Sequence, residues 1–296
     1  MGSLLFKKKV DDRRLAFTLI GPVMIYLSVV MAVPFLWALY TSLTNKMVGT
    51  EGIFIGLKNY VELVHDPLFL KAVTNTLLFT SVTVTAKVVL GTVMALVLNE
   101  DIKARDIFRA FLILPWAIPT LISVFTWQWI YSDVGGVLNY ILMKFGILKQ
   151  QVGWLASRGL AMASVIVVNI WRGIPFLGIS VLAGLQTVDE TLYEAAQIDG
   201  ANGLRRFLHI TIPEVRNVVI LASIVTTIWT LSDFEIIWLL THGGPSDGTQ
   251  VISTLSYTYG FLNQYLGKAI AISVFSFPPL ILLVHYITKK TLESEA

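Results

Sequence analysis

LAFTLIGPVMIYLSVVMAVPFLWALYTSLTN, residues 15–45, is a stretch without a single charged side chain. A helix needs about 20 mostly apolar residues to cross a bilayer, whereas the core of a cleavable signal peptide has only about 7–15. Lys7, Lys8 and Lys9 precede the stretch as they would in a signal peptide. The stretch is too long for that class of segment, and it predicts an uncleaved first membrane helix over 15–43.

The composition of the 296 residues also indicates a membrane protein. Apolar side chains make up 55% and charged ones 14%, against about 25% charged in an ordinary globular chain. Such a chain cannot cover itself with polar groups, so a lipid bilayer must surround part of it. The net charge is only +3, without a basic stripe, which argues against a nucleic-acid partner. There is no Cys, and the four His are far apart, so we expect no metal site.

Long apolar segments recur along the whole chain. Each must satisfy its backbone hydrogen bonds within the bilayer, and the ten-residue alternation of a membrane barrel is absent, so helices are predicted. The expected membrane helices are 15–43, 72–98, 108–131, 159–185, 218–241 and 267–288. The sequence therefore predicts an all-α polytopic bundle of six transmembrane helices over 15–288, between a cytoplasmic segment 1–14 and a cytoplasmic tail 289–296.

Basic residues in the connections predict the orientation. If the N-terminus is cytoplasmic, the inner connections carry Lys7, Lys8, Lys9, Arg13, Arg14, Lys103, Arg105, Arg109, Arg205, Arg206, Arg216, Lys289 and Lys290. The outer connections then carry Lys46, Lys58, Lys71, Lys144, Lys149, Arg158 and Lys268. The inner set is the larger, so the positive-inside rule places both termini in the cytoplasm.

Charged and aromatic residues inside the apolar segments mark a candidate solute path. A charge inside a bilayer costs about 2.5–3.5 kcal/mol on insertion scales, so such residues usually face a partner or a water-filled path. Arg172 could bind solute hydroxyl groups beside a stacking Trp171, or it could form a packing ion pair with Asp233 or Glu235. Lys87 has no assigned role. The candidate path residues are Asn169, Trp171, Arg172, Trp229, Asp233 and Glu235.

The largest inner connection, 186–217, has the pattern of two short helices joined by a bend. Thr187 and Glu190 have the spacing of a capping box, so a helix is expected to begin there. Gly200 suits the left-handed residue that ends a helix, and a second helix is expected from about Asn202. The connection is either a simple hairpin or a docking surface for another protein.

Small and acidic residues at the bend would suit docking as well as a hairpin, because small side chains let another surface approach closely. The small residues are Ala195, Ala196, Gly200 and Ala201. Glu194 and Asp199 could pair with basic groups on that surface, and Pro213 suits the first turn of the next helix.

This connection resembles the EAA motif of inner-membrane permeases of ATP-binding-cassette importers. The motif is Glu-Ala-Ala, a Gly further on, and a later Ile-x-x-Pro or Ile-x-Leu-Pro. The chain has Glu194-Ala195-Ala196, Gly200 and Ile210-Thr211-Ile212-Pro213, with Ile in place of the usual Leu before Pro.

Other stretches resemble the carbohydrate type of these permeases, and among them the MalF- or UgpA-like subunit. The similar stretches are Phe54–Tyr60, Asp66–Phe69, Asn75-Thr76, Leu114–Trp116, Asn139, Trp171–Phe176 and Thr241–Pro245.

The resemblance implies partners and roles. It implies a second, MalG-like permease subunit, two copies of a cytoplasmic ATPase and an extracytoplasmic solute-binding protein. Glu194 would meet a basic residue of the ATPase, and Gly200 would shape the bend. The implied coupling residues are Glu194, Ala195, Ala196, Asp199, Gly200, Ala201, Phe207, Ile210 and Pro213.

The chain itself lacks a nucleotide-binding Gly-x4-Gly-Lys-Ser/Thr segment. ATP and Mg are therefore expected on the partner ATPases, with no cofactor or catalytic residue on this chain. The predicted function is import of a carbohydrate, which includes mono- and oligosaccharides, polyols and sugar derivatives, across a bacterial or archaeal inner membrane. Asp233 and Glu235 would also suit an ion-coupled secondary transporter, although no internal repeat supports it. A membrane-embedded enzyme would need a metal motif or a nucleophile with a base, and neither is visible.

Overall fold

The computed structural model describes residues 12–100 and 105–293. Within these ranges the chain is helical and forms no strand, apart from an isolated antiparallel bridge between Thr44 and Phe54. The predicted all-α fold is confirmed. Most of the expected cytoplasmic segment 1–14, Lys103 and the last three residues lie outside the described residues.

The helices fall into long and short groups. The long ones are α1 (Asp12–Ser42), α3 (Pro67–Asn99), α7 (Arg158–Leu185), α10 (Ile212–Leu231) and α14 (Phe277–Glu293). Intermediate lengths are found in α4 (Arg105–Ala117), α5 (Thr120–Ile130) and α13 (Leu266–Phe275). The short ones are α2 (Lys58–Val64), α6 (Val137–Lys144), α8 (Glu190–Ile198), α9 (Gly203–Arg206), α11 (Glu235–Thr241) and α12 (Ile252–Tyr257). Two π-helical turns, η1 (Phe207–Thr211) and η2 (Thr258–Leu262), follow α9 and α12.

Five helical stretches in the described part are long and apolar enough to cross a membrane. They are Phe17–Ser42, Pro67–Asn99, Arg158–Leu185, Gly203–Leu231 and Leu266–Tyr286. The pair Ile107–Ala117 and Thr120–Ile130 qualifies only together, because its two halves are bent by 95°. With the bent pair counted as one span, the six apolar segments of the sequence correspond to six spans.

The bent pair corrects the prediction of one helix over 108–131. Pro119 adopts an extended conformation, with φ −53° and ψ 138°, and precedes α5. Proline has no backbone N–H and disfavours helical geometry at the residue before it. The chain therefore turns at Ile118, whereas Pro115 is accommodated inside α4.

Two later spans also differ from the prediction. The segment expected at 218–241 is divided into α10, which ends at Leu231, and α11, which begins at Glu235. The Asp233 carboxylate accepts a hydrogen bond from the Ile236 N–H (3.2 Å) and so supports the first turn of α11. The segment expected at 267–288 corresponds to one span, Leu266–Tyr286, in which a turn at Ser276 separates α13 from α14, and α14 continues as helix to Glu293.

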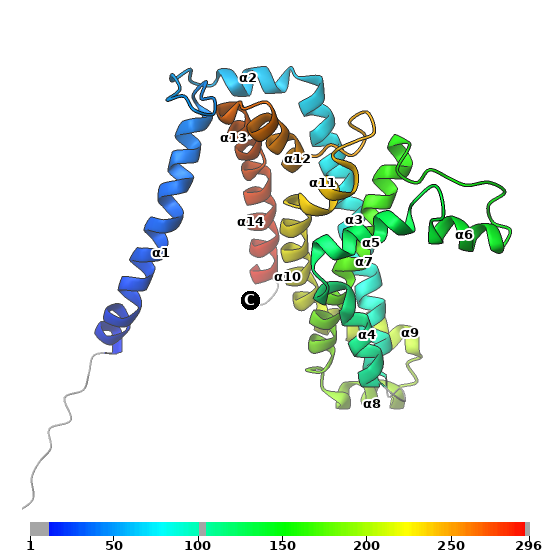
Figure 1. The fold of residues 1–296 in the computed structure, drawn as a ribbon. Helices are drawn as coiled ribbons and strands as arrows, with labels where there is room; N and C mark the ends of the chain where they lie inside the picture. The colour runs from blue at the N-terminus through cyan, green and yellow to red at the C-terminus, as the bar shows by residue number, and fades with distance from the viewer. Residues whose placement is uncertain (1–11, 101–104, 294–296) are drawn as a thin grey trace, which may run out of the picture.

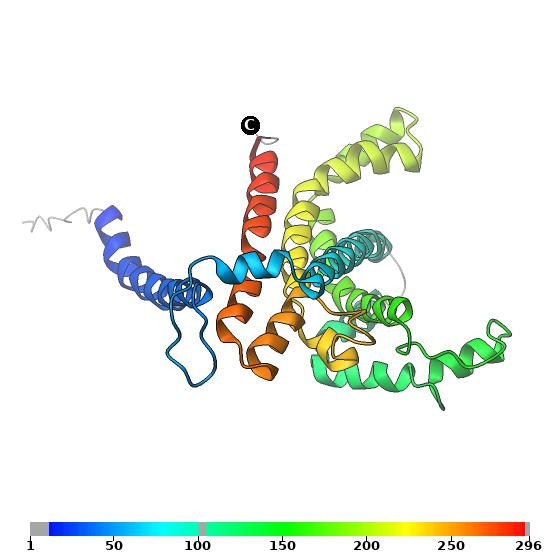
Figure 2. The same cartoon turned by 90° about the horizontal axis from the view of Figure 1, so that it is seen from above.

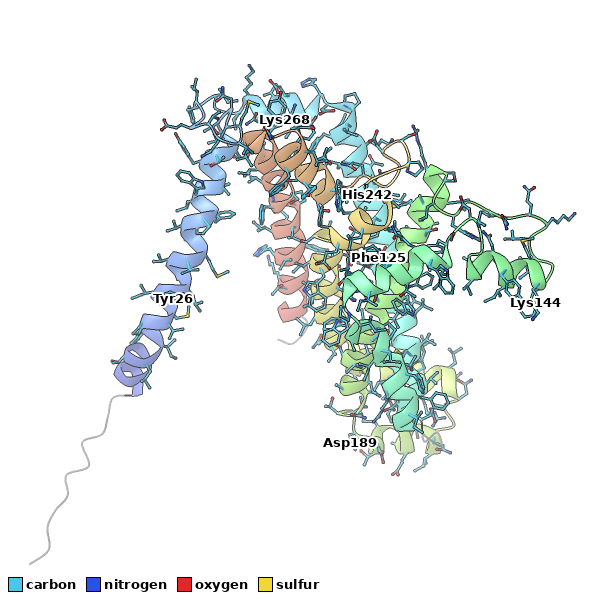
Figure 3. All side chains as sticks on the ribbon, viewed as in Figure 1. Tyr26, Phe125, Lys144, Asp189, His242 and Lys268 are labelled. Carbon is cyan, nitrogen blue, oxygen red and sulfur yellow. The ribbon has the colours of Figure 1, made fainter. Side chains whose placement is uncertain are left out.

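The spans form a bundle with one outlying helix (Figure 1). α3, α7 and α10 pack together at its centre, while α1 stands apart and contacts the rest near its C-terminal end, through α13. Figure 2 shows the same separation from above. Tyr26 lies on the outlying α1, and Asp189 and His242 lie toward opposite ends of the bundle (Figure 3).

Candidate functional site

A cavity of about 170 Å³ lies between α3, α4, α7 and α10, beside the break that precedes α11. We call it the bundle cavity. Its polar lining consists of Lys87, Asn169, Arg172, Thr226, Thr230 and Asp233, and its aromatic lining consists of Trp116, Phe176 and Trp229. Ionisable groups, hydrogen-bonding groups and ring faces therefore converge in the apolar part of the bundle.

Asp233 is held in place by its neighbours. Its carboxylate accepts a hydrogen bond from the Asn169 side-chain amide as well as from the Ile236 N–H. Its backbone carbonyl accepts a hydrogen bond from the Ser253 hydroxyl (2.7 Å), which joins the break to α12. These contacts fix a carboxylate at the cavity wall and leave Asn169 Oδ1 buried without a partner among the described residues.

Arg172 is bound to the bend of the α4–α5 pair. Its Nη1 donates a hydrogen bond to the carbonyl of Ile118 (2.9 Å), so it satisfies a backbone group that Pro119 leaves outside the helix. Within the described chain, Arg172 forms no ion pair with Asp233 or Glu235, so the ion pair expected for a packing role is not present, and its hydrogen bond goes to the Ile118 carbonyl instead. Arg172 and Asp233 also border an adjoining hollow, and Glu235 lines that hollow instead of the bundle cavity.

Lys87 is the residue that sequence reasoning left without a role. It is 4% exposed on α3, and its Nζ donates a hydrogen bond to the Thr230 hydroxyl (3.1 Å) on α10. A Cβ atom on Gly173 would overlap Lys87 Cε and would lie 2.8 Å from Nζ. A glycine on α7 therefore provides the room in which the lysine side chain crosses between the helices.

A polar stripe on α3 could have indicated this role. Thr76, Thr80, Thr83 and Lys87 follow one another at spacings of four, three and four residues, and all four are buried. These spacings place side chains on one helix face. A polar face on a membrane helix is expected to line a protein interior or a path, not lipid.

The aromatic candidates separate into two groups. Trp229 lines the bundle cavity with its ring centroid 4.6 Å from that of Phe176. Trp171 does not line it and instead packs edge-on against Trp127 at 5.6 Å. Trp116, near the C-terminal end of α4, also lines the cavity, although the sequence analysis did not select it as a path residue.

The connection after α7 has two short helices, as the pattern indicated. α8 begins at Glu190 and is capped by Asp189, instead of by a capping box of Thr187 and Glu190. The Asp189 carboxylate accepts a hydrogen bond from the Thr191 N–H (2.9 Å), which lowers the pKa of Asp189 below its usual value. The Thr187 hydroxyl instead donates back to the Gly184 carbonyl (2.8 Å) and closes the end of α7.

The bend between α8 and α9 has the expected geometry. Gly200 adopts φ +75°, the left-handed region that favours glycine. The Asn202 side chain accepts from the Arg205 N–H (2.9 Å) and caps α9. Pro213 lies at the start of α10, although α9, η1 and α10 run as one continuous helical stretch.

This connection presents an exposed surface. α8 has no buried residue; Glu194, Ala195, Asp199, Gly200 and Pro213 are exposed, and Ala196, Ala201, Phe207 and Ile210 are half-buried. Ile198, at the end of α8, is 86% exposed. A contact between the Tyr193 and Thr211 hydroxyls (3.0 Å) holds α8 against η1.

Comparison with known proteins identifies the family of this chain. Residues 87–291 match the family described as "Binding-protein-dependent transport system inner membrane component". The chain belongs to this family. It is therefore a multi-pass membrane permease component of a transport system, and the resemblance of the chain to binding-protein-dependent permeases is confirmed.

Relatives with similar length occur in archaea and bacteria. The trehalose/maltose transport system permease protein MalF of Thermococcus litoralis is 36% identical over 92% of each chain. The sulfoquinovosyl glycerol transport system permease protein SmoG of Agrobacterium fabrum is 33% identical over 90% of this chain and 87% of its own. In structure, the chain is similar to a chain of a bacterial ABC transporter that imports the acidic polysaccharide alginate, with a TM-score of 0.83, 23% identity and coverage of 97% and 98%.

Proposed function

We propose that this chain is one of two permease subunits of an ATP-driven importer and that a carbohydrate crosses the membrane along its bundle cavity. The observation that carries the proposal is the lining of that cavity, where ring faces meet hydrogen-bonding groups in an apolar bundle. Binding sites for small molecules are mostly apolar with a few convergent polar groups. A saccharide matches this lining because it has C–H faces for aromatic rings and hydroxyl groups that both donate and accept.

The relatives support a carbohydrate among the solutes of the family. MalF of Thermococcus litoralis is named for trehalose and maltose, and SmoG for a sulfoquinovosyl glycerol. An alginate transporter with a permease of the same fold has also been solved in complex with a pentasaccharide-bound periplasmic protein. By analogy, an extracytoplasmic binding protein delivers the solute to this chain and to a second, MalG-like permease.

The exposed connection 186–217 is the proposed contact with the ATPases, which bind ATP and Mg. Its bend offers small residues around Gly200 and an exposed acid at Glu194. Movement of the ATPases would move α8, which follows α7 in the chain and leads through α9 and η1 into α10; α7 and α10 both line the bundle cavity. This connection is a physical route from ATP hydrolysis to opening and closing of the path.

The same connection supports the proposed orientation. In Figure 1 the start of α1, the helices α8 and α9 and the end of α14 lie toward one end of the bundle, and α2 and α12 lie toward the other. If α8 contacts cytoplasmic ATPases, both ends of the chain are cytoplasmic. The distribution of basic residues favours the same orientation.

The test is uptake into proteoliposomes that contain the complete transporter and the solute-binding protein. We expect uptake of a radiolabelled saccharide that needs ATP and is insensitive to an uncoupler. Glu194→Lys is expected to abolish uptake and copurification with the ATPase, because it reverses the exposed charge on α8. Glu51→Lys makes the same charge change at an exposed acid in the loop between α1 and α2, outside the connection, and serves as the control.

Two outcomes would contradict the proposal. Uptake that continues without ATP but stops with an uncoupler would favour the ion-coupled secondary transporter. Normal uptake by Glu194→Lys would refute the coupling role of the connection.

A further inference from the structure

The bundle cavity contains two hydrogen-bonding groups that remain unused within the described chain. A lysine ammonium has three N–H donors, and Lys87 Nζ uses one of them toward Thr230. Asn169 Oδ1 has no partner, because the amide nitrogen faces Asp233. Both side chains are only 4% exposed, and both line the same cavity. Buried polar groups without partners are rare in proteins and need an explanation.

Both groups are held in fixed positions. The Lys87 side chain packs directly against Gly173, where a Cβ atom would overlap it, and its Nζ donates a hydrogen bond to the Thr230 hydroxyl. The Asn169 amide is oriented by the Asp233 carboxylate, since an ionised carboxylate only accepts hydrogen bonds and must face the NH₂ group. Two free donors on Lys87 and one buried free acceptor on Asn169 therefore belong to the lining of the same cavity, from α3 and α7, which suits a hydroxyl group that accepts from one residue and donates to the other.

The charges around the cavity are balanced. Lys87 and Arg172 contribute positive charge, and Asp233, together with Glu235 in the adjoining hollow, contributes negative charge. One of the two cations, Arg172, is also bound to the Ile118 carbonyl. The site as a whole therefore has no excess of positive charge that would concentrate an anionic solute.

We propose that Lys87 is a specificity-determining residue of this chain and that, with Asn169, it binds one hydroxyl group of a neutral saccharide. The hydroxyl oxygen accepts a hydrogen bond from Lys87 Nζ, and the hydroxyl hydrogen is donated to Asn169 Oδ1. The inference rests on the proposed function and narrows its solute class. It distinguishes this chain from transporters of acidic sugars, which occur among the relatives and fold neighbours.

The experiment measures uptake by the complete transporter in proteoliposomes for a panel of neutral and anionic saccharides that includes trehalose, maltose and sulfoquinovosyl glycerol. The wild type is expected to transport a neutral member. Lys87→Met retains the apolar stem and is expected to lower Vmax/KM for that member roughly tenfold or more, as for loss of a charged hydrogen bond. Lys58→Met, at an exposed lysine on α2, is the matched control.

Singly deoxygenated analogues of the transported saccharide separate a specificity role from a structural one. The wild type is expected to discriminate against one analogue, and Lys87→Met is expected to transport that analogue and the parent sugar equally well. A variant that merely weakens the bundle would transport both poorly and keep the discrimination. If Lys87→Met is not recovered from membranes, Thr230→Val is used in its place. This variant keeps the Lys87 ammonium group but removes the hydroxyl group that holds it. Reduced discrimination between the analogue and the parent sugar is again expected.

Several results would overturn the inference while the proposed function stands. The first is a wild-type transporter that moves only anionic saccharides. The second is an unchanged Vmax/KM in Lys87→Met. The third is discrimination among the analogues that is the same in the wild type, Lys87→Met and Thr230→Val. A wild-type transporter that moves no saccharide with ATP would instead refute the proposed function, and the inference with it.

Discussion

The exposed connection 186–217 and the bundle cavity are built by different kinds of interaction. In the connection, each conformation is set by neighbours in the sequence: Asp189 and Asn202 cap the helices that follow them, and Gly200 turns the chain. In the cavity, the partners are distant, as with Lys87 and Thr230, which are 143 positions apart. The difference teaches that a docking surface can depend on a local pattern, whereas a solute site depends on the packing of several spans.

This contrast predicts different consequences of substitution. Changes in the connection should weaken the contact with the ATPase and leave the membrane bundle intact. Changes in the bundle cavity should alter both the stability of the bundle and transport, because the same side chains that line the cavity also join its helices.

The largest effect is expected at Gly173, where α7 meets Lys87. Gly173→Val should lower the melting temperature of the detergent-solubilised chain and its recovery from membranes, since the new side chain overlaps the lysine. Overpacking a close contact typically costs about 1–3 kcal/mol and sometimes more. Gly159→Val is the control on the same helix, because no atom lies within 4 Å of the Cβ position there. Equal melting temperatures for Gly173→Val and Gly159→Val would contradict a close contact between Gly173 and Lys87.

A second test concerns Arg172, whose partner is the carbonyl at the bend between α4 and α5. Arg172→Ala should reduce transport and destabilise the bundle by about 1.5–3 kcal/mol, the usual range for a hydrogen bond to a charged group. Thermal melting and uptake across the saccharide panel would be measured together. Lower stability with unchanged solute preference supports the packing role, whereas a changed preference at unchanged stability would assign Arg172 to the solute. Arg158→Ala, at an exposed arginine of the same helix, is the control.

The next effect is expected in the connection, at Gly200. Gly200→Val places a β-branched residue at φ +75°, a left-handed conformation that costs an L-residue about 1–2 kcal/mol. Copurification with the ATPase should fall, while the melting temperature of the membrane bundle stays the same. Gly203→Val, close by at a glycine without positive φ and with open space around it, is the control. A lower melting temperature for Gly200→Val would show that the two regions are not independent.

The smallest effect is expected for Asp189, the cap of α8. Its folded-state pKa is lowered by the Thr191 N–H, so the cap stabilises α8 above the unfolded pKa of about 3.9 and is lost as the pH falls through the folded value. Asp189→Ala should therefore slightly weaken ATPase copurification at pH 7. Hydrogen exchange of the Thr191 amide should be faster in the variant at neutral pH. Equal exchange in the wild type and the variant would show that the cap is absent.

The sequence alone determined the membrane class, the helical fold, the six apolar segments and the form of the connection around Gly200. These features follow from the hydrophobicity of continuous stretches and from hydrogen bonds between residues a few positions apart, which a single sequence displays. It also selected Asn169, Arg172, Trp229 and Asp233, because polar and aromatic residues in apolar segments are conspicuous.

Only the tertiary structure decided which of the selected residues share a cavity. The bend at Pro119 frees the Ile118 carbonyl that binds Arg172, and the break before α11 places Asp233 beside Asn169. Lys87 acquired a role only when Gly173 and Thr230 were found around it. A sequence lists such residues far apart, and their proximity depends on where helices break and how closely their backbones approach, which no local pattern specifies.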